Sequence, residues 1–101
     1  MVGNPERIQI EGIIWDDDIE AHFARHEVAL EDVMAVLDSS PLSFRNVEGR
    51  GGSHVLIGLG ARHRILYISL RRTTRPAIWE PATGWESRFA RRLWQEERGE
   101  T

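Results

Sequence analysis

The sequence is organised around one stretch near its middle, Arg64-Ile-Leu-Tyr-Ile-Ser-Leu-Arg-Arg72. β-branched and aromatic residues dominate this stretch, and arginines close both of its ends, which is typical of a β-strand. Because successive side chains of a strand point to opposite faces, the stretch has two different sides. One side is apolar and is expected to carry helices: Leu66, Ile68 and Leu70. The other side mixes polar and apolar groups, and we expect it to be an exposed working surface: Ile65, Tyr67, Ser69 and Arg71.

Further strands and helices are predicted before and after this stretch, and residues 1–6 are expected to form a loose leader. The strands are expected within Ile8–Trp15, Leu42–Val47, Val55–Leu59 and Ala77–Glu80, with turns at residues 48–53, 60–63 and 73–75. The helices are expected from Asp16 or Asp17 onward, from Leu30 to about Leu37, and from Thr83 to about Arg98. Asp17 with Glu20, and Thr83 with Glu86, have the spacing of capping boxes.

This order of elements predicts a single α+β domain over residues 1–101. Its sheet is an antiparallel β-meander, packed against two N-terminal helices and one C-terminal helix.

The charge is distributed unevenly along the chain, although its formal net value is only −3. Residues 1–61 hold 11 acidic side chains and 4 arginines, whereas residues 62–98 hold 9 arginines and 4 acidic side chains. A basic C-terminal half is compatible with a polyanionic partner such as RNA. The chain has no cysteine, which excludes disulfides and thiolate metal sites. No apolar stretch approaches the length of a membrane span, so we expect no membrane partner and a cytoplasmic location.

Several short motifs resemble a known family. They are Trp15-Asp16, His22-Phe-Ala-Arg-His26, Leu30-Glu-Asp-Val33, Pro81-Ala-Thr83 with Glu86, and Arg91-Arg-Leu-Trp94. In this order, over roughly residues 13–97, they resemble the BrnT-type toxins of bacterial type II toxin–antitoxin systems. The resemblance implies a RelE-like fold, metal-independent cleavage of messenger RNA, and neutralisation by a partner antitoxin protein.

The chain departs from that family pattern at three positions. Glu27 stands where the family usually places a glycine, and Ala29 stands where a small capping residue such as serine is usual. Glu80 stands at a position where the family pattern has an arginine, and an anion there would repel a phosphate. Two functions therefore stay open: a ribonuclease toxin, and a catalytically inactive relative that only binds RNA or a protein partner.

Metal-independent cleavage of RNA needs a base, an acid and cations around the phosphate. The expected catalytic residues are His54, Tyr67, Arg71 and Arg75, because a simple hairpin register places His54 on the same face as Tyr67 and Arg71. The resemblance adds His26, which would reach that face from its helix. The alternative is that Tyr67 is a packing residue and the arginines a solvated rim.

Five further residues are expected to contact RNA or a protein partner: Arg64, Arg88, Arg91, Arg92 and Trp94. Arg88, Arg91 and Arg92 lie at i, i+3 and i+4, on one side of the predicted C-terminal helix. His22 and His26 have a spacing that can hold a metal, but the apolar residues beside them favour packing. We therefore expect no metal and no other cofactor.

Overall fold

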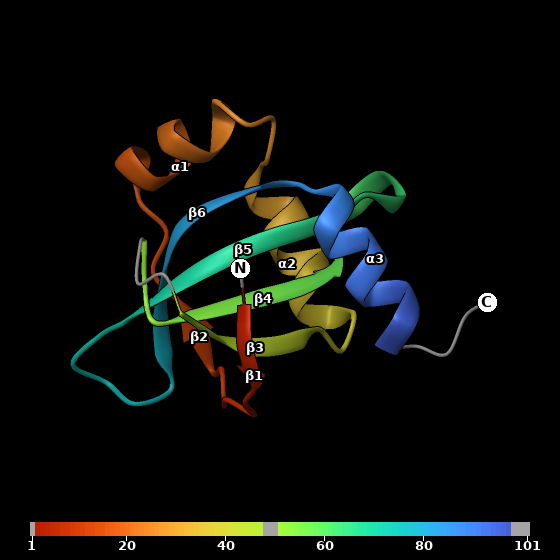
Figure 1. Cartoon of the computed structure of the whole chain (residues 1–101). Helices are drawn as coiled ribbons and strands as arrows, with labels where there is room; N and C mark the ends of the chain where they lie inside the picture. Colours follow the sequence, from red (N-terminus) through yellow and green to blue (C-terminus); the bar gives the residue numbers. More distant parts are fainter. Residues whose placement is uncertain (1, 48–50, 98–101) are drawn as a thin grey trace.

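The computed structural model describes residues 2–47 and 51–97, which form a six-stranded sheet with helices on both faces (Figure 1). In chain order the elements are β1 (Val2–Pro5), β2 (Gly12–Ile13), α1 (Asp17–Ala24), α2 (Leu30–Asp38), β3 (Leu42–Asn46), β4 (His54–Leu59), the 3-10 helix η1 (Ala61–His63), β5 (Ile65–Arg72), β6 (Ile78–Glu86) and α3 (Arg88–Glu97). Within the described ranges, none of the helices combines the length and the apolarity that crossing a membrane requires.

The sheet confirms the predicted α+β class and extends the predicted meander at both edges. Its strand order is β1-β3-β4-β5-β6-β2, in which β2 is parallel to β6 and the other neighbours are antiparallel. The prediction of a loose leader is wrong, because β1 pairs with β3 through Val2 opposite Asn46 and Pro5 opposite Phe44. The predicted strand within Ile8–Trp15 shrinks to the two residues of β2.

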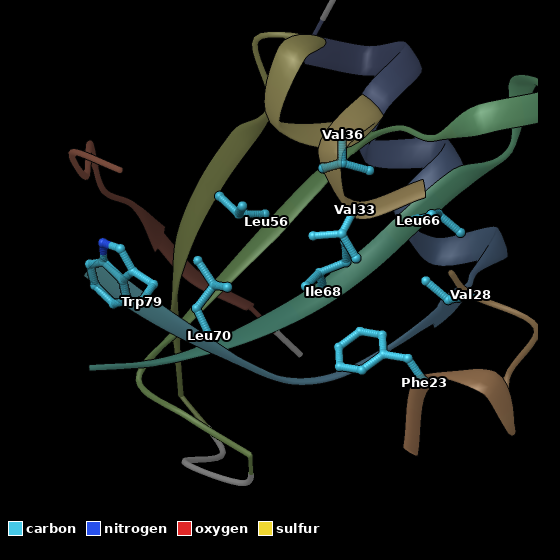
Figure 2. Packing of buried hydrophobic residues seen from close by; sticks show 9 residues of the cluster. All are labelled: Phe23, Val28, Val33, Val36, Leu56, Leu66, Ile68, Leu70 and Trp79. Atoms are coloured by element: carbon cyan, nitrogen blue, oxygen red, sulfur yellow. The ribbon is translucent and has the colours of Figure 1, made fainter. Parts of the chain in front are cut away.

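Two hydrophobic clusters lie on opposite faces of the sheet because side chains alternate along its strands. The cluster under α1 and α2 contains Phe23, Val28, Val33, Val36, Leu56, Leu66, Ile68, Leu70 and Trp79 (Figure 2). The cluster under α3 contains Phe44, Val55, Ile57, Ile65 and Ala90. The prediction that Leu66, Ile68 and Leu70 carry helices is therefore confirmed.

Helix α1 begins and ends through local hydrogen bonds. The Asp16 carboxylate accepts a hydrogen bond from the Ile19 amide at 2.8 Å, so Asp16 is the N-cap. At the other end, the Val28 amide donates to the Phe23 carbonyl at 3.1 Å and the Glu27 amide to the Ala24 carbonyl at 3.0 Å. This is the Schellman arrangement, and Glu27 takes the left-handed conformation it requires, with φ of +59°. Glu27 thus occupies a backbone position that favours glycine.

Helix α3 starts later than predicted, because β6 continues through the residues of the expected capping box. Thr83 pairs with Ser69 and Glu86 with Leu66 in the β5–β6 ladder, so neither residue is free to cap a helix. Ser87 caps α3 instead: its hydroxyl oxygen accepts a hydrogen bond from the Ala90 amide at 3.1 Å. The strand pairing with β5 has overridden the local helix signal.

Candidate functional site

The predicted working face of β5 is largely covered. Ile65 belongs to the core cluster under α3, and Ser69 is only 1% exposed, with its hydroxyl directed to the Gly51 carbonyl. Tyr67 is half-buried, and its ring stacks on Trp85 with the two centroids 4.7 Å apart. Helix α3 and the turn before β4 therefore cover the face that was expected to be open.

His54 lies on the opposite face of the sheet from Tyr67. In the β4–β5 ladder His54 is directly opposite Leu70, whereas Tyr67 is directly opposite Ile57. Because directly opposite residues of an antiparallel pair share a face, His54 points to the α1–α2 side. The observed register differs from the predicted one by a single residue, which moves a side chain to the other face. The grouping of His54 with Tyr67 and Arg71 is therefore wrong.

The two arginines of the predicted catalytic set lie in different settings. Arg71 pairs with Glu80 across the β5–β6 ladder, with Arg71 Nη1 2.7 Å from Glu80 Oε1. Arg75 is exposed in the loop between β5 and β6, and it makes no ion pair with any residue in the described ranges. Glu80 therefore neutralises the one predicted catalytic arginine that lies on the sheet.

The guanidinium group of Arg64 makes two contacts within the fold. Its Nη2 atom lies 3.0 Å from the Asp32 carboxylate, which is 0% exposed, and donates to the Glu27 carbonyl at 2.7 Å. Asp32 also accepts from the Ala29 amide at 2.9 Å and so supports the start of α2, where Ala29 has no side-chain oxygen of its own. Arg64 therefore has a structural role in the fold, and its contact with RNA or a partner stays a prediction.

The remaining partner-binding candidates lie along α3. Trp94 is half-buried and packs against the core cluster under this helix, and its contact with a partner stays a prediction. Arg88, Arg91 and Arg92 are exposed and make no ion pair with other described residues. Arg88 and Arg91 line an open hollow of about 600 Å³ at the start of α3, together with Glu86 and Ser87. This hollow places two exposed guanidinium groups next to the end of β6.

The structure brings five polar and aromatic residues together where α1 crosses β6. We call them the histidine–aromatic cluster: His22, His26, Tyr67, Thr83 and Trp85. The ring centroids of His22 and His26 are 5.9 Å apart, and those of His26 and Trp85 are 6.1 Å apart. His22 Nε2 lies 3.1 Å from Thr83 Oγ1, which links the helix to the strand. Tyr67 also belongs to the cluster, because its ring stacks on Trp85.

The position of α1 over β6 follows from a close contact between Phe23 and Gly84. A Cβ atom at Gly84 would lie 2.8 Å from the Phe23 ring, so a larger residue would push the helix away from the strand. Phe23 is 0% exposed and anchors α1 in the core. His22 in α1 and His26 in the turn that follows α1 flank this anchor, and both are thereby held beside β6.

The histidine–aromatic cluster offers exposed groups suited to proton transfer and to base stacking. His26 is exposed and His22 half-buried, and imidazoles can gain and lose protons near neutral pH. Trp85 is 37% exposed, and an exposed indole is a stacking surface for a nucleobase. Within residues 2–47 and 51–97, no three His, Cys, Asp or Glu side chains are grouped as metal ligands.

Sequence reasoning placed His26 near the working surface but missed its three neighbours. His22 carried a signal, the i, i+4 spacing with His26, which was interpreted as core packing. Trp85 and Thr83 were assigned to a helix, so their pairing with Tyr67 and Ser69 across β5 and β6 was not expected. Only the strand register reveals that these residues meet.

No protein-family model, curated protein or solved structure was found to match this chain.

Proposed function

We propose that this chain is a metal-independent endoribonuclease, the toxin of a toxin–antitoxin pair with a RelE-like fold, and that it acts through the histidine–aromatic cluster. The observation that carries this proposal is the pair of imidazoles, His22 and His26, whose rings lie 5.9 Å apart, with His26 next to the partly exposed Trp85 side chain. Two imidazoles at this separation can both contact one phosphodiester through hydrogen bonds of about 3 Å.

The chemistry requires one proton acceptor and one proton donor. A neutral imidazole takes the proton of the ribose 2′-hydroxyl, whose oxygen attacks the adjacent phosphorus. The second imidazole, in its protonated form, gives a proton to the departing 5′-oxygen, and a 2′,3′-cyclic phosphate is left behind. Trp85 stacks on a neighbouring base and so fixes the position of the scissile phosphate. Arg88 and Arg91 supply positive charge for the RNA backbone at the start of α3.

The proposal is tested by incubating purified, partner-free protein with single-stranded RNA in EDTA. We expect cleavage, and we expect His26→Ala and His22→Ala each to reduce its rate by about 100-fold or more. His63→Ala is the matched control, because His63 is an exposed histidine in η1 and lies outside the cluster. Circular dichroism checks that each variant is folded. Cleavage that survives loss of both histidines would refute the assignment.

A second candidate function, RNA or protein binding without cleavage, is favoured by the Arg71–Glu80 pair. This pair leaves the sheet with a neutralised guanidinium where a catalytic cation was expected. RNA that stays intact in EDTA while the folded protein binds it would select this function. The proposed antitoxin partner is tested by co-expressing the product of a short neighbouring gene and measuring growth and RNA integrity together.

A further inference from the structure

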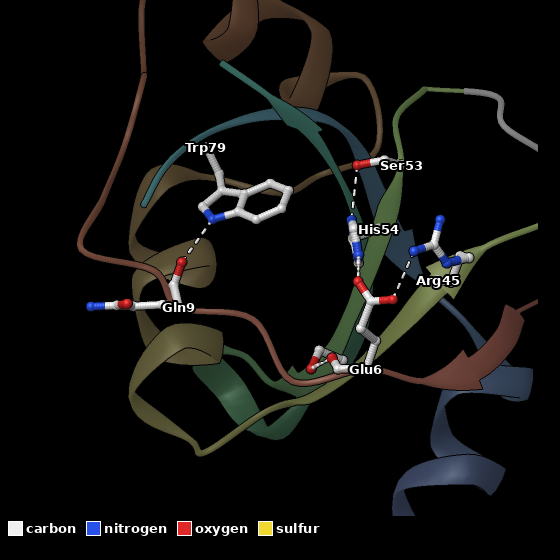
Figure 3. Close-up of polar contacts among 7 residues, drawn as sticks. Glu6, Gln9, Arg45, Ser53, His54 and Trp79 are labelled. Atoms are coloured by element: carbon white, nitrogen blue, oxygen red, sulfur yellow. Dashed lines mark hydrogen bonds and ion pairs between the residues drawn. The ribbon is translucent and has the colours of Figure 1, made fainter. Parts of the chain in front are cut away.

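A second polar constellation lies away from the histidine–aromatic cluster and joins the start of β4 to the segment after β1 (Figure 3). Ser53 Oγ lies 2.8 Å from His54 Nδ1, and the other ring nitrogen of His54 contacts the Glu6 carboxylate. The second oxygen of Glu6 lies 2.9 Å from Arg45 Nη2. We call Ser53, His54 and Glu6 the serine relay. A hydroxyl, an imidazole and a carboxylate are thus connected in series.

The imidazole of the serine relay is fixed in position by its surroundings. His54 is only 1% exposed, and the edge of its ring meets Trp79 with centroids 5.3 Å apart. Trp79 is itself anchored, since its Nε1 donates to the Gln9 carbonyl at 2.9 Å. Ser53, in contrast, is partly exposed at the start of β4. The relay therefore connects a buried imidazole to a residue that is partly exposed.

The carboxylate determines which nitrogen of His54 carries the proton. Hydrogen bonds from His54 and from Arg45 hold the pKa of Glu6 below its ordinary value, so this group is ionised near neutral pH. An ionised carboxylate can only accept hydrogen bonds, so Nε2 of His54 carries the hydrogen. In neutral His54 the lone pair then lies on Nδ1, and the Ser53 hydroxyl must donate to it. This is the geometry of a serine with its general base.

From this arrangement we infer that Ser53 is an activated nucleophile and that the chain is acylated there by activated carboxylic esters. In the reaction, the Ser53 Oγ–H bond breaks and its proton moves to His54 Nδ1 while Oγ bonds to the carbonyl carbon of the ester. The carbon–oxygen bond to the leaving group then breaks, and the proton on His54 passes to the departing alkoxide, which leaves as an alcohol or a phenol. The acyl group remains on Ser53 as an ester.

The serine relay is independent of the proposed function, because it contains no residue of the histidine–aromatic cluster. A purely structural role would need only the contact between His54 and Glu6, which ties the segment after β1 to β4. Such a tie would function equally well without the Ser53 hydroxyl. Chemical reactivity of Ser53 therefore distinguishes the two roles.

The composition of the chain makes a clean test possible. The chain has no lysine and no cysteine, so two common side-chain targets of acylating reagents are absent. The α-amino group, the histidines and Tyr67 remain as targets, and peptide mapping distinguishes them from Ser53. The full-length protein is incubated with p-nitrophenyl acetate. Release of p-nitrophenol is followed by absorbance, and the modified residue is identified by intact mass and peptide mapping. Thr74, an exposed hydroxyl in the same molecule, serves as an internal reference.

Among the hydroxyl side chains we expect an acetyl group on Ser53, none on Thr74, and no such adduct at position 53 in Ser53→Ala. Glu6→Gln keeps the shape of the carboxyl group but removes its charge, and we expect it to slow acetylation at least about tenfold while the protein stays folded. This variant keeps the test valid if substitution of the buried His54 prevents folding. An unmodified Ser53 in the folded wild-type protein, or equal acetylation rates in the wild type and Glu6→Gln, would overturn the inference.

Discussion

Arg71 Nη1 lies 2.7 Å from Glu80 Oε1, and the two residues are directly opposite each other in the β5–β6 ladder. Their side chains are 55% and 30% exposed, so water screens the pair and its contribution to stability is at most about 1 kcal/mol. The pair matters more for the surface charge than for the fold. It cancels a cation at a place where the chain could otherwise contact a polyanion.

Removing the Glu80 charge should therefore strengthen RNA binding. In Glu80→Gln, Arg71 becomes free to contact one phosphate, and we expect affinity for single-stranded RNA to rise by about fivefold, which corresponds to about 1 kcal/mol. One more phosphate contact should also make the slope of log K against log[salt] more negative by about 0.7. Fluorescence anisotropy at several potassium chloride concentrations measures both quantities.

The control for this experiment is Glu31→Gln, which makes the same charge change on the exposed side of α2. We expect it to leave RNA affinity nearly unchanged. The double variant Glu80→Gln with Arg71→Ala should lose the gain, since the freed cation is then absent. An equal gain in Glu31→Gln would mean that net charge, and not Arg71, is responsible.

Arg64 should be needed for stability. Replacing it with alanine leaves the Asp32 carboxylate buried without its cation, and we expect Arg64→Ala to lower the free energy of unfolding by about 3 kcal/mol. The neighbouring exposed Arg62 is the control, and Arg62→Ala should change stability by less than about 0.5 kcal/mol. Urea denaturation followed by circular dichroism measures both. An unchanged stability of Arg64→Ala combined with weaker RNA binding would instead restore Arg64 as a contact residue.

The class of the fold could be predicted because strong local patterns coincide with tertiary packing. In β5 the alternation correctly identified Leu66, Ile68 and Leu70 as the side that packs under α1 and α2, although α3 covers much of the other side as well. The start of α1 was predicted at Asp16 or Asp17, and the cap is Asp16, so the expected Asp17–Glu20 capping box does not form. The extent of α2 followed from its apolar periodicity.

The site could not be predicted to the same extent, because it depends on how strands align. A shift of one residue in the β4–β5 register decides whether His54 and Tyr67 lie on the same face of the sheet, and the observed register places them on opposite faces. Thr83 and Glu86 form a strong local helix signal, yet pairing with β5 makes them part of a strand and places Trp85 against Tyr67. The burial of Arg64 depends on Asp32, which lies on a different element. None of these three relationships is encoded within a short window of sequence.

The ionised carboxylate of Glu6 should contribute to the free energy of unfolding, and this contribution should be lost at acidic pH. The hydrogen bonds from His54 and Arg45 place the pKa of Glu6 in the folded protein below its value in the unfolded chain. Between these two values the unfolded chain binds more protons, so the stabilisation is present above about pH 4.3 and is lost as the pH falls through the folded pKa. We expect Glu6→Gln to flatten the fall of the unfolding free energy in this range.

Glu96→Gln is the control for the acid titration, because Glu96 is an exposed carboxylate on α3. Denaturant unfolding at a series of pH values below 5 or so compares the two variants with the wild type. Parallel acid profiles for the wild type and Glu6→Gln would show that the contact between Glu6 and His54 does not contribute to stability.

Glycine at position 27 should stabilise the protein. Glu27 has a φ of +59° at the end of α1, and a non-glycine residue in this left-handed region is strained by about 1 kcal/mol or more. Glu27→Gly removes that strain and keeps the backbone carbonyl that accepts from Arg64, but it also makes the unfolded chain more flexible. We expect a net gain of up to about 1 kcal/mol in urea denaturation. Ala21→Gly, at an exposed position of α1 with ordinary helical geometry, should instead lose about 1 kcal/mol. Similar losses in both variants would show that Glu27 is not strained.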